Sequence, residues 1–357
     1  MTKTTFNIFR GSQTNDIVPD TTTRDLGPHD VFIEITHASL CGTDRLFRHN
    51  GMALGHEGAG VVRQVGEQVT SLKPGDAVGL TWIQKVCGMC DQCMTDKDQY
   101  CDFKEAYGTH DLDIGTFASH VVWHESMVIK LPPGLEPEYA APLMCGGATV
   151  WGAMTSYDLK PGDRVGIAGV GGLGHMAIQF ASALGCDVVV LSSNESKRNE
   201  AMALGAKEFY VTDDAPREQI KRLHHLYWCA NSHPDFSNSK RHECKLTADR
   251  VLPLIAPGGS IYPLTVSLQP STVPIQQLVS NGIKIQGSAV ASRRSIRRLL
   301  DFVVLHGIRP ITMSFPLNKD GIQRSFQVLE EGRMRYRAVL VAERYLMTKP
   351  IAERQQA

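Results

Sequence analysis

The sequence lacks an excess of charge of either sign. Lysine and arginine together number 37, and aspartate and glutamate also number 37, so the formal net charge at pH 7 is +0. No apolar run approaches the roughly 18 residues that a membrane-spanning helix needs, and no internal repeat or low-complexity tract is present. These absences argue against nucleic acid and membrane as partners. A small molecule is the expected ligand.

The first twenty residues contain no continuous apolar stretch after their early lysine, so they do not resemble a secretory signal. The chain nevertheless contains nine cysteines. Disulfides are rare in reducing compartments, where clustered cysteines more often bind metal. We therefore expect a cytoplasmic, metal-binding protein. Its 357 residues are enough for two domains, and its 42% hydrophobic content is that of a globular protein.

Four of the cysteines lie in the short segment VCGMCDQCMTDKDQYC, with the spacing C-x2-C-x2-C-x7-C. One loop of this kind can fold around a single tetrahedral Zn²⁺ and supply four thiolates, which leaves no open coordination position. A closed site of this type is structural. The alternatives are four unrelated buried thiols or two disulfides, which the missing export signal disfavours. The predicted ligands are Cys87, Cys90, Cys93 and Cys101.

The pattern of expected secondary structure changes along the chain. Up to about residue 145, short β-rich runs alternate with Gly and Pro turns, which predicts an antiparallel, barrel-like body. Strands and helices then alternate, which predicts a parallel sheet, and residues 283–342 return to the texture of the first body. The expected strands of the first body are 31–37, 59–65, 76–80 and 117–122. The expected elements of the second are helices 148–157, 174–184 and 195–204 and strands 164–168 and 187–191.

Residues 169–174 read GVGGLG and match the pattern G-x-G-x-x-G. The motif follows an apolar strand and opens an amphipathic helix, which is the context in which it binds a dinucleotide. Gly169 permits the tight turn, Gly171 lets the backbone approach a pyrophosphate, and Gly174 lets the helix pack closely. The alternative is a glycine-rich connection without a ligand. The candidate cofactor contacts in this loop are Gly169, Gly171, Gly172, Leu173 and Gly174.

The residues after the next expected strand predict which dinucleotide binds. Enzymes that use NAD usually have Asp or Glu at its end, where the carboxylate binds the ribose 2′-hydroxyl. This chain has Ser192 there, followed by Ser193 and then Lys197. Two hydroxyls and a cation suit a 2′-phosphate, and Glu195 comes three residues too late to replace the missing carboxylate. We therefore predict NADP(H) as the cofactor.

A second set of metal ligands is spread along the chain. Cys41 lies in CGTD, His56 lies in GHEG, and Cys145 follows Pro142 at the end of the first body. Two thiolates and one imidazole make three ligands and leave a fourth position for water or substrate, as a catalytic Zn²⁺ requires. Either cysteine alone would more readily be an ordinary buried thiol. Together with the four-cysteine loop, the set predicts a second zinc ion.

The sequence resembles the zinc-dependent alcohol dehydrogenases of the medium-chain dehydrogenase/reductase superfamily. It is closest to the cinnamyl-alcohol-dehydrogenase-like branch and is similar to its fungal members. The resemblance runs over nearly the whole chain. Its motifs are CGTD at 41–44, GHEGAG at 55–60, the cysteine loop at 87–101, PLMCGGATVW at 142–151, GVGGLG at 169–174 and LSSNESK at 191–197.

The resemblance implies an α/β and β architecture. A discontinuous GroES-like catalytic domain, expected at 1–146 and 288–357, would carry both zinc sites. A doubly wound Rossmann domain, expected at 147–287, would bind NADP(H), and the active site would lie between the two domains. Relatives commonly form homodimers through an edge of the Rossmann sheet, here expected at 282–287.

The resemblance also implies roles for individual residues. Asp44 would orient His56 through its other ring nitrogen. Glu57 would act as a transient alternative zinc ligand, and Thr43 would hydrogen-bond the substrate alcohol and pass its proton outward. The further cofactor contacts would be Thr149 near the nicotinamide, Arg337 at the diphosphate, and Ser288.

The implied reaction is hydride transfer between NADPH and an aldehyde carbonyl polarised by zinc. Two departures from the family pattern stand out. Leu46 occupies the position where many relatives have a relay histidine, so either His49 replaces it or water leaves directly from Thr43. The loop between Cys41 and His56 is also shorter than in many relatives, which should alter one wall of the substrate site.

Two further features each allow two interpretations. Trp82 lies five residues before Cys87, where relatives place an aromatic residue that lines the pocket. It either stacks on flat, unsaturated or aromatic substrates or packs in the core. The polar stretch 230–249 is predicted to be a surface loop, and the alternative, suggested by its histidines and cysteine, is another metal site.

The sequence therefore predicts an NADP-dependent zinc alcohol dehydrogenase acting mainly as an aldehyde reductase. One alternative is an NAD-dependent polyol or secondary-alcohol dehydrogenase, but polyol enzymes generally have an acidic third ligand where this chain has Cys145. A zinc-free quinone or enoyl reductase conflicts with the six matched cysteines. A non-catalytic NADP-binding protein of the same fold would have no need for an open zinc site.

Overall fold

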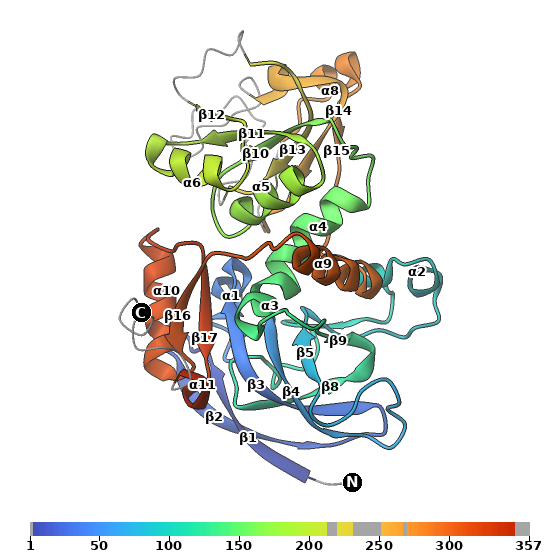
Figure 1. Ribbon diagram of the computed structural model, residues 1–357. Helices are drawn as coiled ribbons and strands as arrows, with labels where there is room; N and C mark the ends of the chain where they lie inside the picture. The colour runs from blue at the N-terminus through green and yellow to red at the C-terminus, as the bar shows by residue number, and fades with distance from the viewer. Residues whose placement is uncertain (1–2, 213–219, 231–250, 267–269, 271, 347–357) are drawn as a thin grey trace. The chain divides into compact units, whose positions relative to one another are not determined.

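The structure, a computed structural model, describes residues 3–212, 220–230, 251–266, 270 and 272–346. The chain forms two compact units. The first unit combines Met1–Ala148 with Ala291–Ala357, and the second unit is Thr149–Val290. Figure 1 labels the helices and strands of both. The chain thus leaves the first unit and later returns to it.

The first unit is built on a seven-stranded sheet in the order β16-β17-β3-β4-β5-β9, with β8 paired to β3. All pairs are antiparallel except β16 with β17, which is parallel. β3 is central, because it pairs with β8 near its beginning, with β17 near its end and with β4 along its length. The strands are β3 (Asp30–Leu40), β4 (Gly58–Val65), β5 (Ala77–Leu80), β8 (His120–His124), β9 (Val128–Lys130), β16 (Thr312–Pro316) and β17 (Arg337–Val341).

Apolar side chains of these strands make the core of the first unit. Ile33, Ile35, Val62, Val78 and Val121 are at most 1% exposed. Helix α3 packs on β3, β4 and β5, so it closes this core from one side. The remaining elements are β1 (Lys3–Arg10), β2 (Val18–Asp25), α1 (Gly42–Phe47), β6 (Ile83–Lys85), α2 (Asp91–Met94), η1 (Asp98–Tyr100), β7 (Glu105–Ala106), η2 (Glu125–Met127), α3 (Pro137–Pro142), η3 (Leu143–Gly147), α9 (Arg293–Leu305), α10 (Lys319–Glu330) and α11 (Glu343–Leu346).

One strand of the first unit begins later than the sequence predicts. The β-rich run 117–122 suggested a single strand, but β8 starts at His120. The residues before it pair elsewhere: Phe9 donates its N–H to the carbonyl of Phe117, and Ser119 donates to the carbonyl of Asn7. These residues therefore bind β1 before the chain crosses to β3. Hydrophobic pattern alone cannot separate two partners for one continuous run.

The second unit contains a six-stranded sheet in the order β12-β11-β10-β13-β14-β15, and every pair is parallel. Counted along the chain, the order is 3-2-1-4-5-6, which is that of the doubly wound dinucleotide-binding fold. The predicted fold class is thus confirmed. The elements are α4 (Ala148–Thr155), β10 (Arg164–Ala168), α5 (Gly174–Ala183), β11 (Asp187–Ser192), η4 (Glu195–Lys197), α6 (Arg198–Ala203), β12 (Glu208–Val211), β13 (Leu223–Trp228), η6 (Leu252–Leu254), β14 (Ile255–Pro263), α8 (Ile275–Asn281) and β15 (Lys284–Ile285).

The topology of this sheet places the glycine-rich loop at the carboxyl ends of the strands, where ligands bind. The loop follows β10, and the strand order reverses between β10 and β13. Ligands of open parallel sheets bind outside the carboxyl ends of the strands at such a switch point. The neighbouring strand β11 is parallel to β10, so its carboxyl end, where Ser192 lies, is on the same side of the sheet. The sheet therefore brings together two segments that the sequence assigned to one cofactor.

Candidate active site and metal centres

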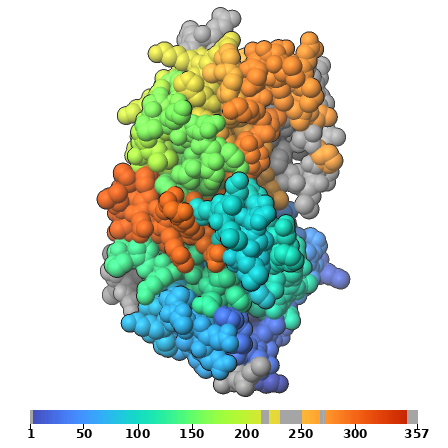
Figure 2. All heavy atoms as spheres, turned by 90° about the vertical axis from the view of Figure 1, so that its right-hand side faces the viewer, coloured from blue at the N-terminus to red at the C-terminus, as the bar shows by residue number. Residues whose placement is uncertain are grey.

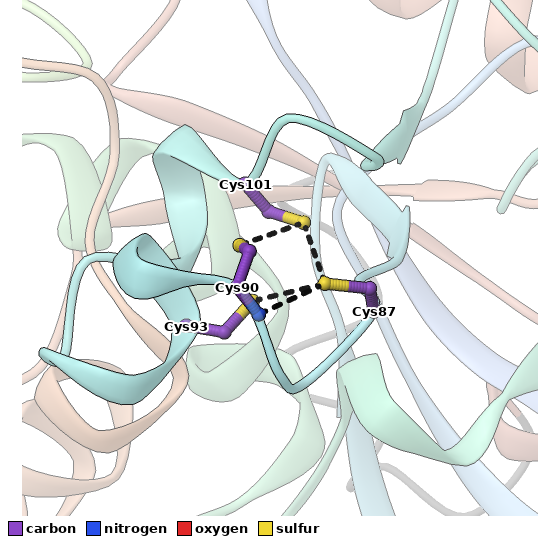
Figure 3. A group of neighbouring side chains, drawn as sticks. All are labelled: Cys87, Cys90, Cys93 and Cys101. Atoms are coloured by element: carbon purple, nitrogen blue, oxygen red, sulfur yellow. Dashed lines mark hydrogen bonds between the residues drawn. The ribbon is translucent and has the colours of Figure 1, made fainter.

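The four cysteines of the loop at 87–101 converge on one point, as Figure 3 shows. Cys90 is the N-cap of α2, Cys93 lies within α2, and Cys101 follows η1. The Sγ atom of Cys87 lies 3.9 Å from that of Cys93 and 3.6 Å from that of Cys101. The Sγ atoms of Cys90 and Cys101 are 3.8 Å apart. Four sulfurs at about 2.3 Å from one tetrahedral zinc ion would be separated by about 3.8 Å. The donor set therefore fits a structural zinc.

Backbone groups favour the thiolate form of one of these four cysteines. The N–H groups of Met89 and Cys90 lower the pKa of Cys87 to about 6. Burial has the opposite effect on Cys93 and raises its pKa to about 12. The thiol of Cys93 must therefore lose its proton when a cation binds, so metal binding here releases protons.

The four-cysteine loop also holds the start of helix α9, where the chain returns to the first unit. The N–H of Arg293 donates to Asp98 Oδ1 at 3.0 Å, and the hydroxyl of Ser292, the N-cap of α9, bonds to Asp96. Asp98 is buried at 3% exposure. Figure 2 shows the orange-red residues of α9 lying against the cyan loop. Loss of order in the loop should therefore loosen α9 as well.

The second predicted set also comes together. Cys41 is the N-cap of α1, His56 lies just before β4, and Cys145 lies in the π-helical turn η3. One ligand atom from each residue lies within 4.8 Å of the other two, and His56 Nε2 is 3.2 Å from Cys145 Sγ. Single π-helical turns often occur at functional sites. Three donors of this chemistry fit a catalytic zinc with one open position.

Asp44 links two members of this set. Its Oδ1 lies 2.9 Å from His56 Nδ1, and its Oδ2 accepts from the backbone N–H of Cys41 at 2.9 Å. Asp44 and His56 are both 0% exposed. The nearby Cys145 and His56 lower the pKa of Cys41 well below its usual range, so this sulfur is ready to bind a cation. Thr43 Oγ1 lies 3.7 Å from Cys41 Sγ, at the edge of the set.

Glu57 and Arg337 are placed against each other. The buried guanidinium of Arg337 forms an ion pair with Glu57 Oε1 and donates to Ser39 Oγ at 3.0 Å. The other carboxylate oxygen of Glu57 accepts from the N–H of Gly146, which follows a predicted zinc ligand, at 3.3 Å. Glu57 is thus near the ligand set without being one of the three convergent donors. Its role as a ligand, and that of Arg337 toward diphosphate, stay predictions.

The glycine-rich loop has the shape expected of a phosphate cradle. A side chain at Gly174 would place its Cβ 1.9 Å from the carbonyl oxygen of Gly169, so only glycine fits there. At Gly171 no atom lies within 4 Å of the position a Cβ would take, which leaves open space beside the backbone. Such space is what a pyrophosphate requires. The loop therefore fits a dinucleotide, although Gly172 and Leu173 have no individual contact that defines their roles.

A buried histidine that the sequence reasoning missed supports this loop. His175, the second residue of α5, is 0% exposed, and its Nδ1 lies 2.9 Å from the carbonyl oxygen of Gly171. Burial lowers the pKa of His175 to about 4, so the ring is neutral and Nδ1–H donates to that carbonyl. Its position directly after the motif was the signal available in the sequence.

The residues predicted to select the cofactor lie around the end of β11. Ser192 is buried at 6% exposure and Ser193 is exposed. Lys197 Nζ donates to the carbonyl of Val170 at 2.6 Å, which holds its charge beside the glycine-rich loop. Glu195 is exposed and paired with Arg198, with Oε2 and Nη2 at 3.1 Å.

The other predicted contacts are less constrained. Thr149 and Ser288 are both half-buried in the second unit. Trp82 is half-buried against the core of the first unit, which is compatible with either reading of its role. His49 is exposed and Leu46 is half-buried. The stretch 230–249 lies outside the described residues apart from its first, Ala230.

A parallel dinucleotide-binding sheet, a four-thiolate loop and a three-ligand set together define a zinc-dependent dehydrogenase. Family models agree: residues 27–133 match the alcohol dehydrogenase GroES-like domain, and residues 172–304 match the zinc-binding dehydrogenase family. The chain belongs to the zinc-dependent alcohol dehydrogenases of the medium-chain dehydrogenase/reductase superfamily.

Individual relatives support this assignment. A probable cinnamyl alcohol dehydrogenase of Aralia cordata is 35% identical over 336 residues, covering 89% of each chain. An NADP-dependent alcohol dehydrogenase of Mycolicibacterium smegmatis is 32% identical over 334 residues, covering 89% of this chain and 92% of that protein. The structure of a cinnamyl alcohol dehydrogenase from Sorghum bicolor superposes with a TM-score of 0.85 at 28% identity, covering 95% of this chain and 98% of the other. The cinnamyl-like resemblance is thus confirmed, and its fungal part finds no support.

Proposed function

We propose that this protein is an NADP(H)-dependent zinc alcohol dehydrogenase that works mainly as an aldehyde reductase. The observation that carries the proposal is the convergence of Cys41, His56 and Cys145 with one coordination position left for substrate. The four-cysteine loop supplies all four of its own ligands, so it has no room for substrate. The NADP-dependent alcohol dehydrogenase and the cinnamyl alcohol dehydrogenases among the relatives support the same activity.

When bound, zinc supplies Lewis-acid polarisation of a carbonyl, and the nicotinamide supplies the hydride. The chain supplies orientation and proton handling. Asp44 holds His56 Nδ1, so that Nε2 faces the cysteine sulfurs. Thr43 Oγ1 is the hydroxyl beside Cys41 and would hold the proton that the alcohol gains or loses. With Leu46 in the usual relay position, that proton would leave from Thr43 to water.

The proposed substrate is an aromatic, unsaturated or bulky aldehyde. Trp82 is half-buried directly before β6, at the base of the cysteine loop, and its ring would stack on such a substrate, because aromatic pairs prefer stacked or edge-to-face contact. The cinnamyl alcohol dehydrogenases named above point to the same substrate class. The test is a panel of aromatic, unsaturated and short aliphatic aldehydes with purified protein and NADPH. Absence of NADPH oxidation with every member would refute the proposed activity.

The preference for NADPH leads to a direct test at the end of β11. Ser192→Asp is expected to weaken NADPH binding about 100-fold and to favour NADH, because its carboxylate would repel a 2′-phosphate and accept from a 2′-hydroxyl. Glu195 cannot already fill this role while it is paired with Arg198. The measurement is kcat/KM with each cofactor. The control Ser192→Asn adds similar bulk without charge, and an Asp variant that retains NADPH preference contradicts the assignment.

We further propose a homodimer formed through the edge of the parallel sheet. Among the strands of the described residues, β15 pairs with β14 alone, and the adjacent helix α8 exposes Ile275 at 64% and Val279 at 75%. An unpaired strand edge and an apolar helix stripe one turn long suit a two-fold contact between identical chains. Val279→Glu is expected to give monomers in light scattering, whereas Leu305→Glu, at the 79% exposed last residue of α9, should not. A monomeric wild type contradicts this proposal.

A cytoplasmic location fits the cysteine chemistry. The eight described cysteines are free thiols, and six of them belong to the two predicted zinc sets. Thiolate ligands persist where thiols are kept reduced. Among the described residues, no helix has both the length and the apolar character needed to cross a bilayer.

A further inference from the structure

Tyr107 is a buried tyrosine beside the catalytic ligand set, and the mechanism above gives it no role. Its side chain is 0% exposed, and it lies in the same unit as the three ligands. Its ring centroid is 4.9 Å from that of His56 and 5.4 Å from that of Phe47. Its backbone N–H donates to the carbonyl of Trp82 at 3.0 Å. Tyr107 is therefore held by its backbone and its ring.

The hydroxyl of Tyr107 has two partners whose chemistry fixes the direction of each hydrogen bond. The N–H of Gly55 donates to Tyr107 Oη at 3.1 Å. Because a backbone N–H cannot accept, the hydroxyl proton goes to its other partner, Asp44 Oδ1, 3.0 Å away. The chain of donation thus runs from Gly55 through Tyr107 to Asp44.

This direction decides how the proton sits on the neighbouring ring. Asp44 Oδ1 accepts from Tyr107, and the same oxygen lies 2.9 Å from His56 Nδ1. An ionised carboxylate can only accept, so in the neutral ring that a metal ligand requires the proton lies on Nδ1. In that form the lone pair of Nε2 is directed toward Cys145 Sγ, which lies 3.2 Å away. That is the tautomer a zinc ligand needs.

We propose that Tyr107 is a positioning residue for the catalytic zinc, acting through Asp44 to hold His56 in its metal-binding tautomer. The inference rests on the proposed zinc site at Cys41, His56 and Cys145. Without the hydroxyl, the N–H of Gly55 is left without its acceptor, and Asp44 loses one of its three bonds. A less constrained carboxylate orients His56 less well. Outer partners of this kind typically contribute about 10–100-fold to metal affinity.

The hairpin that carries Tyr107 is also the base of the four-cysteine loop. Strands β6 and β7 pair with each other, and the four cysteines lie between them in the sequence. Tyr107 follows β7 directly. The four-cysteine loop fits the structural zinc. The residue at its base, Tyr107, carries the hydroxyl that acts through Asp44 on His56, a predicted ligand of the catalytic zinc. The paired strands β6 and β7 thus hold the backbone of Tyr107, and with it the hydroxyl, in a defined place.

The test is the rate of zinc release from the full-length, zinc-loaded protein, followed with a chromogenic chelator. Tyr107→Phe keeps the ring between His56 and Phe47 and removes only the hydroxyl. We expect the catalytic zinc to leave about 10–100-fold faster, while release from the four-cysteine loop is unchanged. Asp44→Asn should act in the same direction. Because both residues act through one chain of bonds, the double variant should lose zinc no faster than Asp44→Asn alone.

A matched control uses another buried tyrosine. Tyr227 lies in β13 of the second unit, and its hydroxyl makes no hydrogen bond within the described residues. Tyr227→Phe should leave zinc release unchanged. Equal release from Tyr107→Phe and wild type, or additive effects with Asp44→Asn, would overturn the inference. A wild-type protein that holds zinc only in the four-cysteine loop would instead refute the proposed function, so the two failures are distinguishable.

Discussion

Cys145→Ala is expected to reduce NADPH-dependent aldehyde reduction by at least about 10³-fold while the protein stays folded. The sulfur of Cys145 is one of three donors and lies 3.2 Å from His56 Nε2, so its removal leaves too few ligands for an open catalytic zinc. The residue lies in a helical turn that alanine can also adopt. The measurement is kcat/KM together with circular dichroism and the melting temperature.

Cys186→Ala is the matched control for that variant. Cys186 is also a buried cysteine, but it lies in the second unit and its sulfur contacts only the carbonyl of Lys160 among the described hydrogen bonds. Its loss should leave kcat/KM near the wild-type value. If Cys145→Ala reduces aldehydes as fast as the control, Cys145 is not a ligand of the catalytic zinc.

Cys101→Ser is expected to act on stability first. Metal binding at a closed four-thiolate site is coupled to folding, and its loss should cost several kcal/mol, which lowers the melting temperature by ~10 °C or more. Cys101 is 0% exposed, so the variant also leaves a hydroxyl in an apolar setting. The effect should reach α9, whose first N–H bonds to Asp98 in the same loop. Thermal unfolding and the yield of soluble protein measure this.

Met94→Ser provides the comparison, because Met94 belongs to the same loop but is 74% exposed. It should leave the melting temperature nearly unchanged. If Cys101→Ser loses activity without losing stability, and Cys145→Ala loses stability without losing activity, the division into a structural and a catalytic site is wrong.

The parts of the fold and site that the sequence predicts are those in which spacing dictates chemistry. Four thiols within one short loop can converge with little help from the rest of the fold. The glycine motif is recognisable because strand, turn and helix are contiguous, and Gly174 is required by the 1.9 Å approach of a backbone oxygen. The parallel sheet follows from the alternation of strands and helices.

The contacts that the sequence does not predict are those between distant segments. Tyr107 reaches Asp44 across 63 positions, and Arg337 reaches Glu57 across 280. No local period or motif connects such pairs. The partner of a β-rich run is equally hidden, which is why the pattern predicts one strand over 117–122, whereas β8 begins at His120 and the residues before it bond to β1. Which polar side chains are buried also cannot be predicted from the sequence, because burial depends on the packing of distant segments.

The central claim is that the chain holds two zinc ions of different kinds, and a metal count tests it most directly. Elemental analysis of the purified wild-type protein should give about two zinc ions per chain, and Cys145→Ala should give about one, because the four-thiolate loop remains intact. A wild type with one zinc, or a variant that still holds two, would contradict the account.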